Sequence, residues 1–85
     1  MYRWELDGPA RLETESLPPH VRKELNAFME AVVIVDPMEY QRYPGEPDKP
    51  MRSLHFGQHD EGLVTFLIYP PDELVLVVQI QWLGD

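Results

Sequence analysis

The chain has 85 residues, of which 15 are acidic and 7 are basic, giving a formal net charge of −8, and it contains no cysteine. This length fits a single domain over residues 1–85, and 44% hydrophobic residues suffice for a core. The lack of cysteine excludes disulfides, thiolate catalysis and sulfur-ligated metals. The negative charge disfavours direct binding to DNA, to RNA phosphates and to anionic membranes.

The first residues, Met1-Tyr2-Arg3-Trp4-Glu5, lack the apolar run of a signal peptide. The longest apolar stretch, residues 31–35, is far shorter than the roughly 20 residues of a membrane helix. We therefore expect a soluble, cytoplasmic protein that makes no membrane contact.

The first half of the chain is expected to form a strand and two helices. Alternating apolar and polar residues predict a half-buried strand over 2–6. Asp7 as a cap and Pro9 in the first turn predict a short helix over 9–16 that buries Leu12. After Pro18 and Pro19, apolar residues recur at steps of four and three, which indicates one face of a second helix. They are Val21, Leu25, Phe28, Val32 and Val35.

The end of the second helix is ambiguous in sequence. The β-branched run 32–35 also suits a strand, but the periodicity upstream favours helix. Asp36-Pro37 ends this element, because the residue before a proline avoids the helical region. Residues 37–50 contain four prolines, counting Pro37 and Pro50, and one glycine, which predicts a long loop.

The second half of the chain predicts three strands, over 51–56, 63–69 and 73–83, joined by a glycine-bounded turn and by Pro70-Pro71-Asp72. The fold class is therefore α+β: an N-terminal strand, a two-helix segment, then a three-stranded antiparallel sheet.

Strict alternation gives the last strand two different faces. One face is entirely apolar, and the other turns polar toward its end, where the glutamines mark a surface open to water or to a ligand. Because the first half of this strand is apolar on both sides, we expect it to be central in the sheet. The first face carries Leu74, Leu76, Val78, Ile80 and Trp82, and the second carries Val75, Val77, Gln79 and Gln81.

Few residues point to catalysis or to metal binding. His55 and His59 are four positions apart on an extended segment, which separates them by roughly 13 Å and does not suit a single metal ion. No Gly-x-Ser-x-Gly elbow and no phosphate-binding glycine loop is present. We therefore predict neither a metal site nor a cofactor.

The order of elements and several local motifs resemble the RelE/ParE toxin superfamily. The segment Leu17-Pro18-Pro19-His20-Val21-Arg22 is similar to the start of the family's second helix, and Val35-Asp36-Pro37 to the motif that follows it. Residues 51–57 resemble the family's second strand, and 74–81 its apolar last strand. The resemblance covers nearly the whole chain.

This resemblance implies a toxin–antitoxin system, of the kind that includes plasmid stabilisation, and an antitoxin-like protein as partner. The family's ribosome-dependent members cut mRNA with basic and acid–base residues on the open sheet face and near the C-terminus. Carried over residue by residue, the catalytic candidates here are His55, Gln79, Gln81 and Arg52.

The chain departs from the family pattern at its candidate site. The strand 63–69 has no arginine, Gln79 and Gln81 stand where an arginine is usual, and residues 83–85 lack the family's terminal His or Tyr. Glutamine can hydrogen-bond a phosphate but cannot neutralise it. We therefore expect a toxin-family protein that acts by binding a protein partner, with nuclease activity weak or lost.

Two alternatives stay open at this point. One is a ribosome-dependent mRNA endoribonuclease, and the other is a stand-alone interaction module that reuses the fold. Direct DNA binding is not expected, contact with the ribosome and mRNA is disfavoured by charge, and an oligomer is left open.

Overall fold

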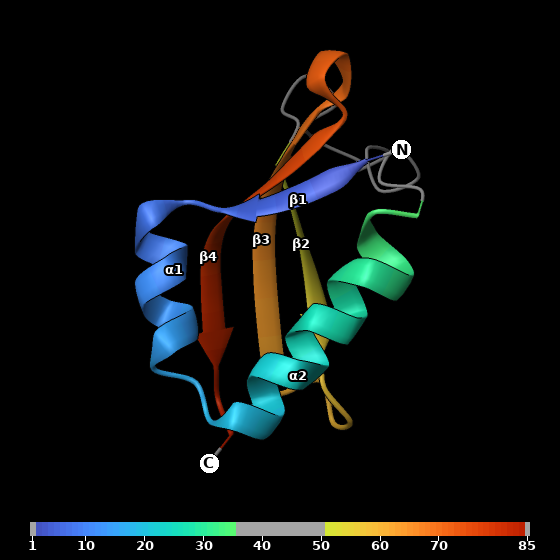
Figure 1. Cartoon of the computed structure of the whole chain (residues 1–85). Helices are drawn as coiled ribbons and strands as arrows, with labels where there is room; N and C mark the ends of the chain where they lie inside the picture. Colours follow the sequence, from blue (N-terminus) through green and yellow to red (C-terminus); the bar gives the residue numbers. More distant parts are fainter. Residues whose placement is uncertain (1, 36–50, 85) are drawn as a thin grey trace.

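The computed structural model describes residues 2–35 and 51–84 of the chain (Figure 1). They form the predicted α+β arrangement of an N-terminal strand, a helical pair and three further strands. The predicted loop over 36–50 lies outside the described residues. The elements are β1 (Arg3–Leu6), α1 (Gly8–Glu15), α2 (Pro19–Phe28), β2 (Met51–Phe56), β3 (Gly62–Tyr69) and β4 (Leu74–Trp82).

The four strands form one mixed sheet in the order β1-β4-β3-β2. The predicted antiparallel unit of three strands is present, since β3 pairs antiparallel with both β2 and β4. The N-terminal strand extends this sheet by pairing parallel to β4. As predicted from its apolar composition, β4 is central, with β1 on one side and β3 on the other.

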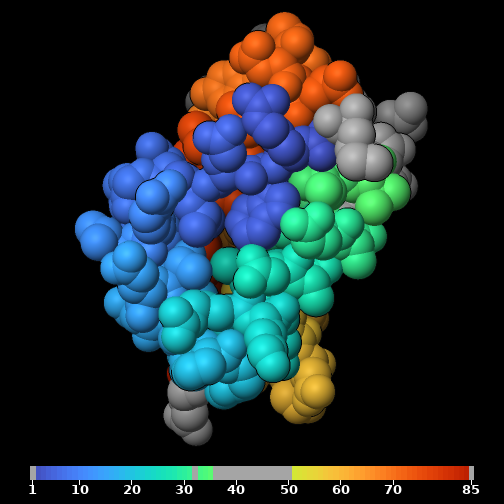
Figure 2. Space-filling model, viewed as in Figure 1, coloured from blue at the N-terminus to red at the C-terminus, as the bar shows by residue number. Residues whose placement is uncertain are grey.

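The core lies between the sheet and α2, which crosses one face of the sheet (Figure 1). From this side, the side chains of α1, β1 and α2 hide most of the middle of the sheet (Figure 2). Val21 and Leu25 are buried as predicted, and Phe28 is half-buried against the core; the side chain of Val32 is outside the described part. Their main partners in the sheet are Phe56, Val64, Phe66, Ile68, Val75, Val77 and Ile80.

The short first helix forms, but it buries a different residue from the one predicted. Ala10 is fully buried, whereas Leu12 is 66% exposed. The α1 helix packs beside β4 with Ala10 on its buried side, and Leu12, two positions further along the helix, points outward. Asp7 occupies the N-cap position without a side-chain capping hydrogen bond.

The end of α2 differs from a regular α-helix. The turn Met29–Val33 is π-helical, and the Ile34 amide donates to the Met29 carbonyl at 3.1 Å. Such a wider turn rotates the side chains that follow it. Met29 and Val33, at the two ends of this turn, are buried, whereas Val35, predicted on the buried face, follows the turn and is 70% exposed. Among the described helices, none is long and apolar enough to cross a membrane.

Candidate functional site on the open sheet face

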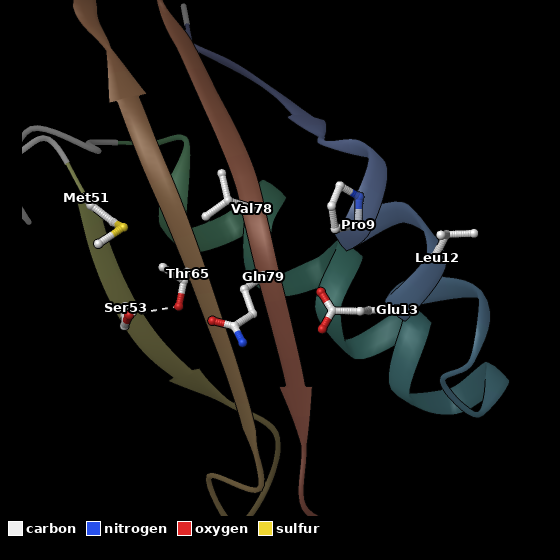
Figure 3. A pocket seen from close by; sticks show the side chains of 8 residues that line it. All are labelled: Pro9, Leu12, Glu13, Met51, Ser53, Thr65, Val78 and Gln79. Carbon is white, nitrogen blue, oxygen red and sulfur yellow. Dashed lines mark hydrogen bonds between the residues drawn. The ribbon is translucent and has the colours of Figure 1, made fainter.

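The side of the sheet that faces away from α2 carries three cross-strand rows of side chains; Figure 3 shows the middle row, with Met51 of the first. Residues that pair in neighbouring antiparallel strands point to the same face, so the register defines each row. The rows run across β4, β3 and β2, and we call their nine side chains the open face. They are Leu76, Leu67 and Met51, then Gln79, Thr65 and Ser53, then Gln81, Leu63 and His55.

A β-bulge decides which residues of β4 reach the open face. Thr65 pairs with Gln79 and Phe66 pairs with Val77, which leaves Val78 without a partner in β3. An extra residue of this kind shifts the alternation of its strand by one position.

This shift corrects the prediction from strict alternation. Alternation alone put Gln79 and Gln81 on the same face as Val75 and Val77. In the structure both valines are fully buried in the core, whereas both glutamines are exposed on the opposite side. The bulge therefore allows one strand to give only apolar side chains to the core while its amides face outward.

The middle row is a chain of neutral hydrogen-bonding groups. Ser53 Oγ and Thr65 Oγ1 are 2.9 Å apart, and either hydroxyl can donate. Gln79 is the cross-strand neighbour of Thr65 on β4 (Figure 3). Hydroxyls and a side-chain amide can both donate and accept hydrogen bonds but carry no charge. This row therefore suits polar, uncharged groups of a ligand.

A shallow hollow of about 730 Å³ opens over the middle row. Residues of α1 form one wall, and β2 forms the opposite side (Figure 3). Among the described residues of this lining, Glu13 is the one ionisable side chain. The lining residues are Pro9, Leu12, Glu13, Met51, Ser53, Thr65, Val78 and Gln79.

Glu13 connects α1 to the edge of β4. Its Oε1 accepts a hydrogen bond from the backbone amide of Ile80 at 3.1 Å. Because β1 pairs with β4 only at residues 74–77, this carboxylate satisfies a strand donor that β1 does not reach. Sequence reasoning did not identify Glu13, and no local pattern could, since the two partners are 67 positions apart.

His55 and Gln81 lie in the third row, on the same face as Ser53 and Gln79. Leu63 lies between them, so their backbones are two strand spacings, about 10 Å, apart. Neither residue lines the hollow. The open face thus brings the histidine and both glutamines together on one surface, without a direct contact among them.

Arg52 is not part of this surface. It pairs with Phe66 on the core side of the sheet and is only 5% exposed. Its guanidinium Nη1 donates to the Met51 carbonyl at 2.6 Å. Of the four catalytic candidates, the structure therefore brings His55, Gln79 and Gln81 to one face and directs Arg52 to the other.

The hairpin tip between β2 and β3 forms a second hollow, of about 440 Å³, against the start of α2. His59 lines this hollow, whereas His55 lies in the third row of the open face. Within the described ranges, no group of three or more His, Asp or Glu side chains is arranged to hold a metal. The hollow is lined by His20, Glu24, Gln58, His59, Glu61 and Trp82.

The fold defines a class of small α+β proteins in which helices cover one side of a four-stranded sheet and leave the other side open. Within that class the chain has the RelE-like toxin fold. No protein-family profile matches the chain, and no curated protein matches it in sequence. The matches that were found are to solved structures.

Over its whole length the chain is similar to a chain of the intact E. coli RelBE toxin–antitoxin complex, with a TM-score of 0.77 and 16% identity over 100% of both chains. The isolated E. coli RelE toxin gives a TM-score of 0.78 and 17% identity, covering 100% of this chain and 87% of that one. The RelBE2 toxin–antitoxin complex of Mycobacterium tuberculosis gives 0.76 and 16%, covering 95% and 96%. The resemblance found in the sequence is thereby confirmed at the level of the fold.

Proposed function

We propose that this protein is the toxin-fold member of a toxin–antitoxin-type pair and that it acts by binding a protein partner, with mRNA cleavage weak or lost. The RelE-like fold supports this proposal. Similar structures were solved as complexes with an antitoxin, among them RelBE from E. coli and RelBE2 from M. tuberculosis.

The observation that carries the proposal is the absence of Lys and Arg from the three rows of the open face. Cleavage of an RNA phosphodiester by its 2′-hydroxyl builds negative charge on the phosphorus oxygens, and that charge needs preorganised cationic or strong donors. Gln79 and Gln81 can donate hydrogen bonds but bring no charge. Arg52, the one arginine among the candidates, is buried on the other side of the sheet.

A second function, endoribonuclease activity, is favoured by one feature of the same face. His55 is exposed in β2 on the side that carries both glutamines, where an acid–base group would be required. Its distance of about 10 Å from Gln81, two strand spacings away, argues against joint action on one phosphate. We therefore rank this function second.

Induced expression separates the two functions. We expect at most weak growth arrest and no codon-phased cuts when translated messages are mapped by primer extension. His55→Ala serves as the control, since this exposed side chain makes no contact needed by the core. Strong cleavage that disappears in His55→Ala would establish the nuclease and overturn the proposal.

The partner is tested separately. If a small antitoxin-like reading frame adjoins the gene, its product should form a stable complex with this protein in size-exclusion chromatography. If the gene has no adjacent antitoxin-like reading frame, and the protein neither arrests growth nor cuts mRNA, the protein is instead a stand-alone interaction module.

A further inference from the structure

The open face carries apolar side chains that the core does not use. Leu67, Leu76 and Met51 form a continuous row across three strands. Leu63 lies on the same face beyond the middle row, and Val78 lines the hollow beside Gln79. None of these five belongs to the core cluster or to the side chains packed against it. Met51 is 46% exposed, and the other four are half-buried. A contiguous apolar surface of this kind marks an interaction site more often than isolated exposed residues do.

The hydrogen-bonding row lies directly beside the apolar row. Ser53, Thr65 and Gln79 form the row next to Met51, Leu67 and Leu76 on the same three strands. Figure 3 shows Met51 beside this second row. An extended peptide alternates its side chains and exposes amide and carbonyl groups between them. Such a segment can place apolar side chains on the first row and hydrogen-bond to the hydroxyls and the amide of the second. On α1, Leu12 extends the apolar wall of the hollow and is 66% exposed.

Charge distinguishes among the molecules that could cover this face. The chain has a net charge of −8, the rows carry no Lys or Arg, and Glu13 borders the hollow. A polyanion such as RNA is repelled at long range, and a second copy of this chain brings the same excess negative charge. A positively charged protein segment is attracted by the same field.

We infer that the open face binds an extended, basic and apolar segment of a partner protein, in which Leu- or Val-type side chains alternate with Lys or Arg. The apolar side chains pack on Leu67, Leu76 and Met51, the backbone hydrogen-bonds to the middle row, and the cations face the acidic surroundings. This inference rests on the proposed function, because it specifies where and by what chemistry the protein partner is bound.

Synthetic peptides test the inference without knowledge of the natural partner. The first alternates Leu and Lys over about ten residues, enough to cross the sheet at roughly 3.3 Å per residue. A Leu/Glu peptide keeps the apolar residues and reverses the charge, a Ser/Lys peptide keeps only the charge, and a single-stranded RNA oligonucleotide serves as the polyanion. We expect the Leu/Lys peptide to bind tightest and to shift the amide resonances of Thr65, Leu67 and Gln79.

Matched variants locate the surface. Met51→Lys and Leu12→Lys place a cation on the proposed site, and each should weaken the Leu/Lys peptide about tenfold by removing apolar contact and adding repulsion. Val35→Lys makes the same change in charge at an equally exposed position at the end of α2 and should bind as the wild type does. Circular dichroism confirms that each variant is folded.

Several outcomes would overturn the inference. One is that all three peptides bind with equal affinity, and another is that RNA binds more tightly than the Leu/Lys peptide. The others are that a second copy of the chain occupies the face, or that Val35→Lys and Met51→Lys lose the same amount of affinity for the Leu/Lys peptide. Its failure differs from failure of the proposed function. If messages are cleaved and the Leu/Lys peptide still binds selectively, only the proposed function is refuted. If the partner forms a stable complex whose affinity is unchanged by Met51→Lys, only the assigned surface is refuted.

Discussion

Glu13 Oε1 accepts the hydrogen bond of the Ile80 backbone amide at 3.1 Å, which ties the first helix to the second half of the central strand. The contact lies where β1 no longer covers the edge of β4. A helix carboxylate here takes the place of a neighbouring strand, and an edge so covered is protected from pairing with other chains. The same side chain borders the hollow of the open face, so stability and site geometry are linked at this residue.

We predict that Glu13→Ala lowers the free energy of unfolding by about 1 kcal/mol, because the Ile80 amide loses its acceptor. Glu15→Ala is the matched control, since Glu15 is an exposed residue of the same helix and should have little effect. Urea titration followed by circular dichroism measures both. Equal stability of the two variants would show that the contact does not contribute.

Gly62→Ala should be destabilising, by about 1–3 kcal/mol in the free energy of unfolding. A Cβ atom at this position would lie 2.4 Å from the ring of Phe56, which is part of the core. At Gly8 an added Cβ meets nothing within 4 Å beyond its two chain neighbours, so Gly8→Ala should cost clearly less than Gly62→Ala. Thermal unfolding compares the two, and an unchanged midpoint for Gly62→Ala would contradict the close approach of the ring.

The π-helical turn at the end of α2 can be tested with a pair of identical substitutions. Val33→Ala should lower the free energy of unfolding by about 1–3 kcal/mol, because Val33 is fully buried. Val35→Ala should change it little, since Val35 is 70% exposed. Urea titration measures both. A larger loss of unfolding free energy in Val35→Ala than in Val33→Ala would instead support the regular helix that the sequence periodicity predicted.

Restoring cations to the open face should restore affinity for nucleic acid. We predict that the double variant Gln79→Arg/Gln81→Arg binds single-stranded RNA more tightly than the wild type, with a steep dependence on salt. Asn26→Arg/Ala27→Arg adds the same charge on exposed positions of α2 and serves as the control. Fluorescence anisotropy at low and physiological salt measures both, and equal gains would indicate a response to net charge alone.

Elements with a strong local signal could be predicted from sequence. The helical spacing of Val21 and Leu25 identified the buried face of α2, and the strongly β-prone segment 63–69 identified β3. The motifs around residues 17–25 and 51–57 led to the fold that the solved structures confirm. In each case neighbouring residues carry the information.

The features that sequence missed depend on partners far along the chain. The bulge at Val78 exists because Thr65 and Phe66 pair with Gln79 and Val77, and alternation within β4 contains no trace of it. The burial of Ala10 in place of Leu12 depends on how α1 packs beside β4. For the same reason Glu13 was not identified, although it borders the hollow and holds the strand edge.

The position of β4 between β1 and β3 has a consequence for synthesis of the protein. Within residues 2–35 and 51–84, the first strand pairs with β4 alone, and β4 follows all other described elements in the chain. Until β4 leaves the ribosome, β1 has no neighbour and β3 has one unpaired edge, so the nascent chain cannot complete its core. Folding of this domain therefore waits for β4, and pairing of strands so far apart in sequence is slow. A partner that recognises the finished sheet would accordingly meet only molecules in which β4 has already been made.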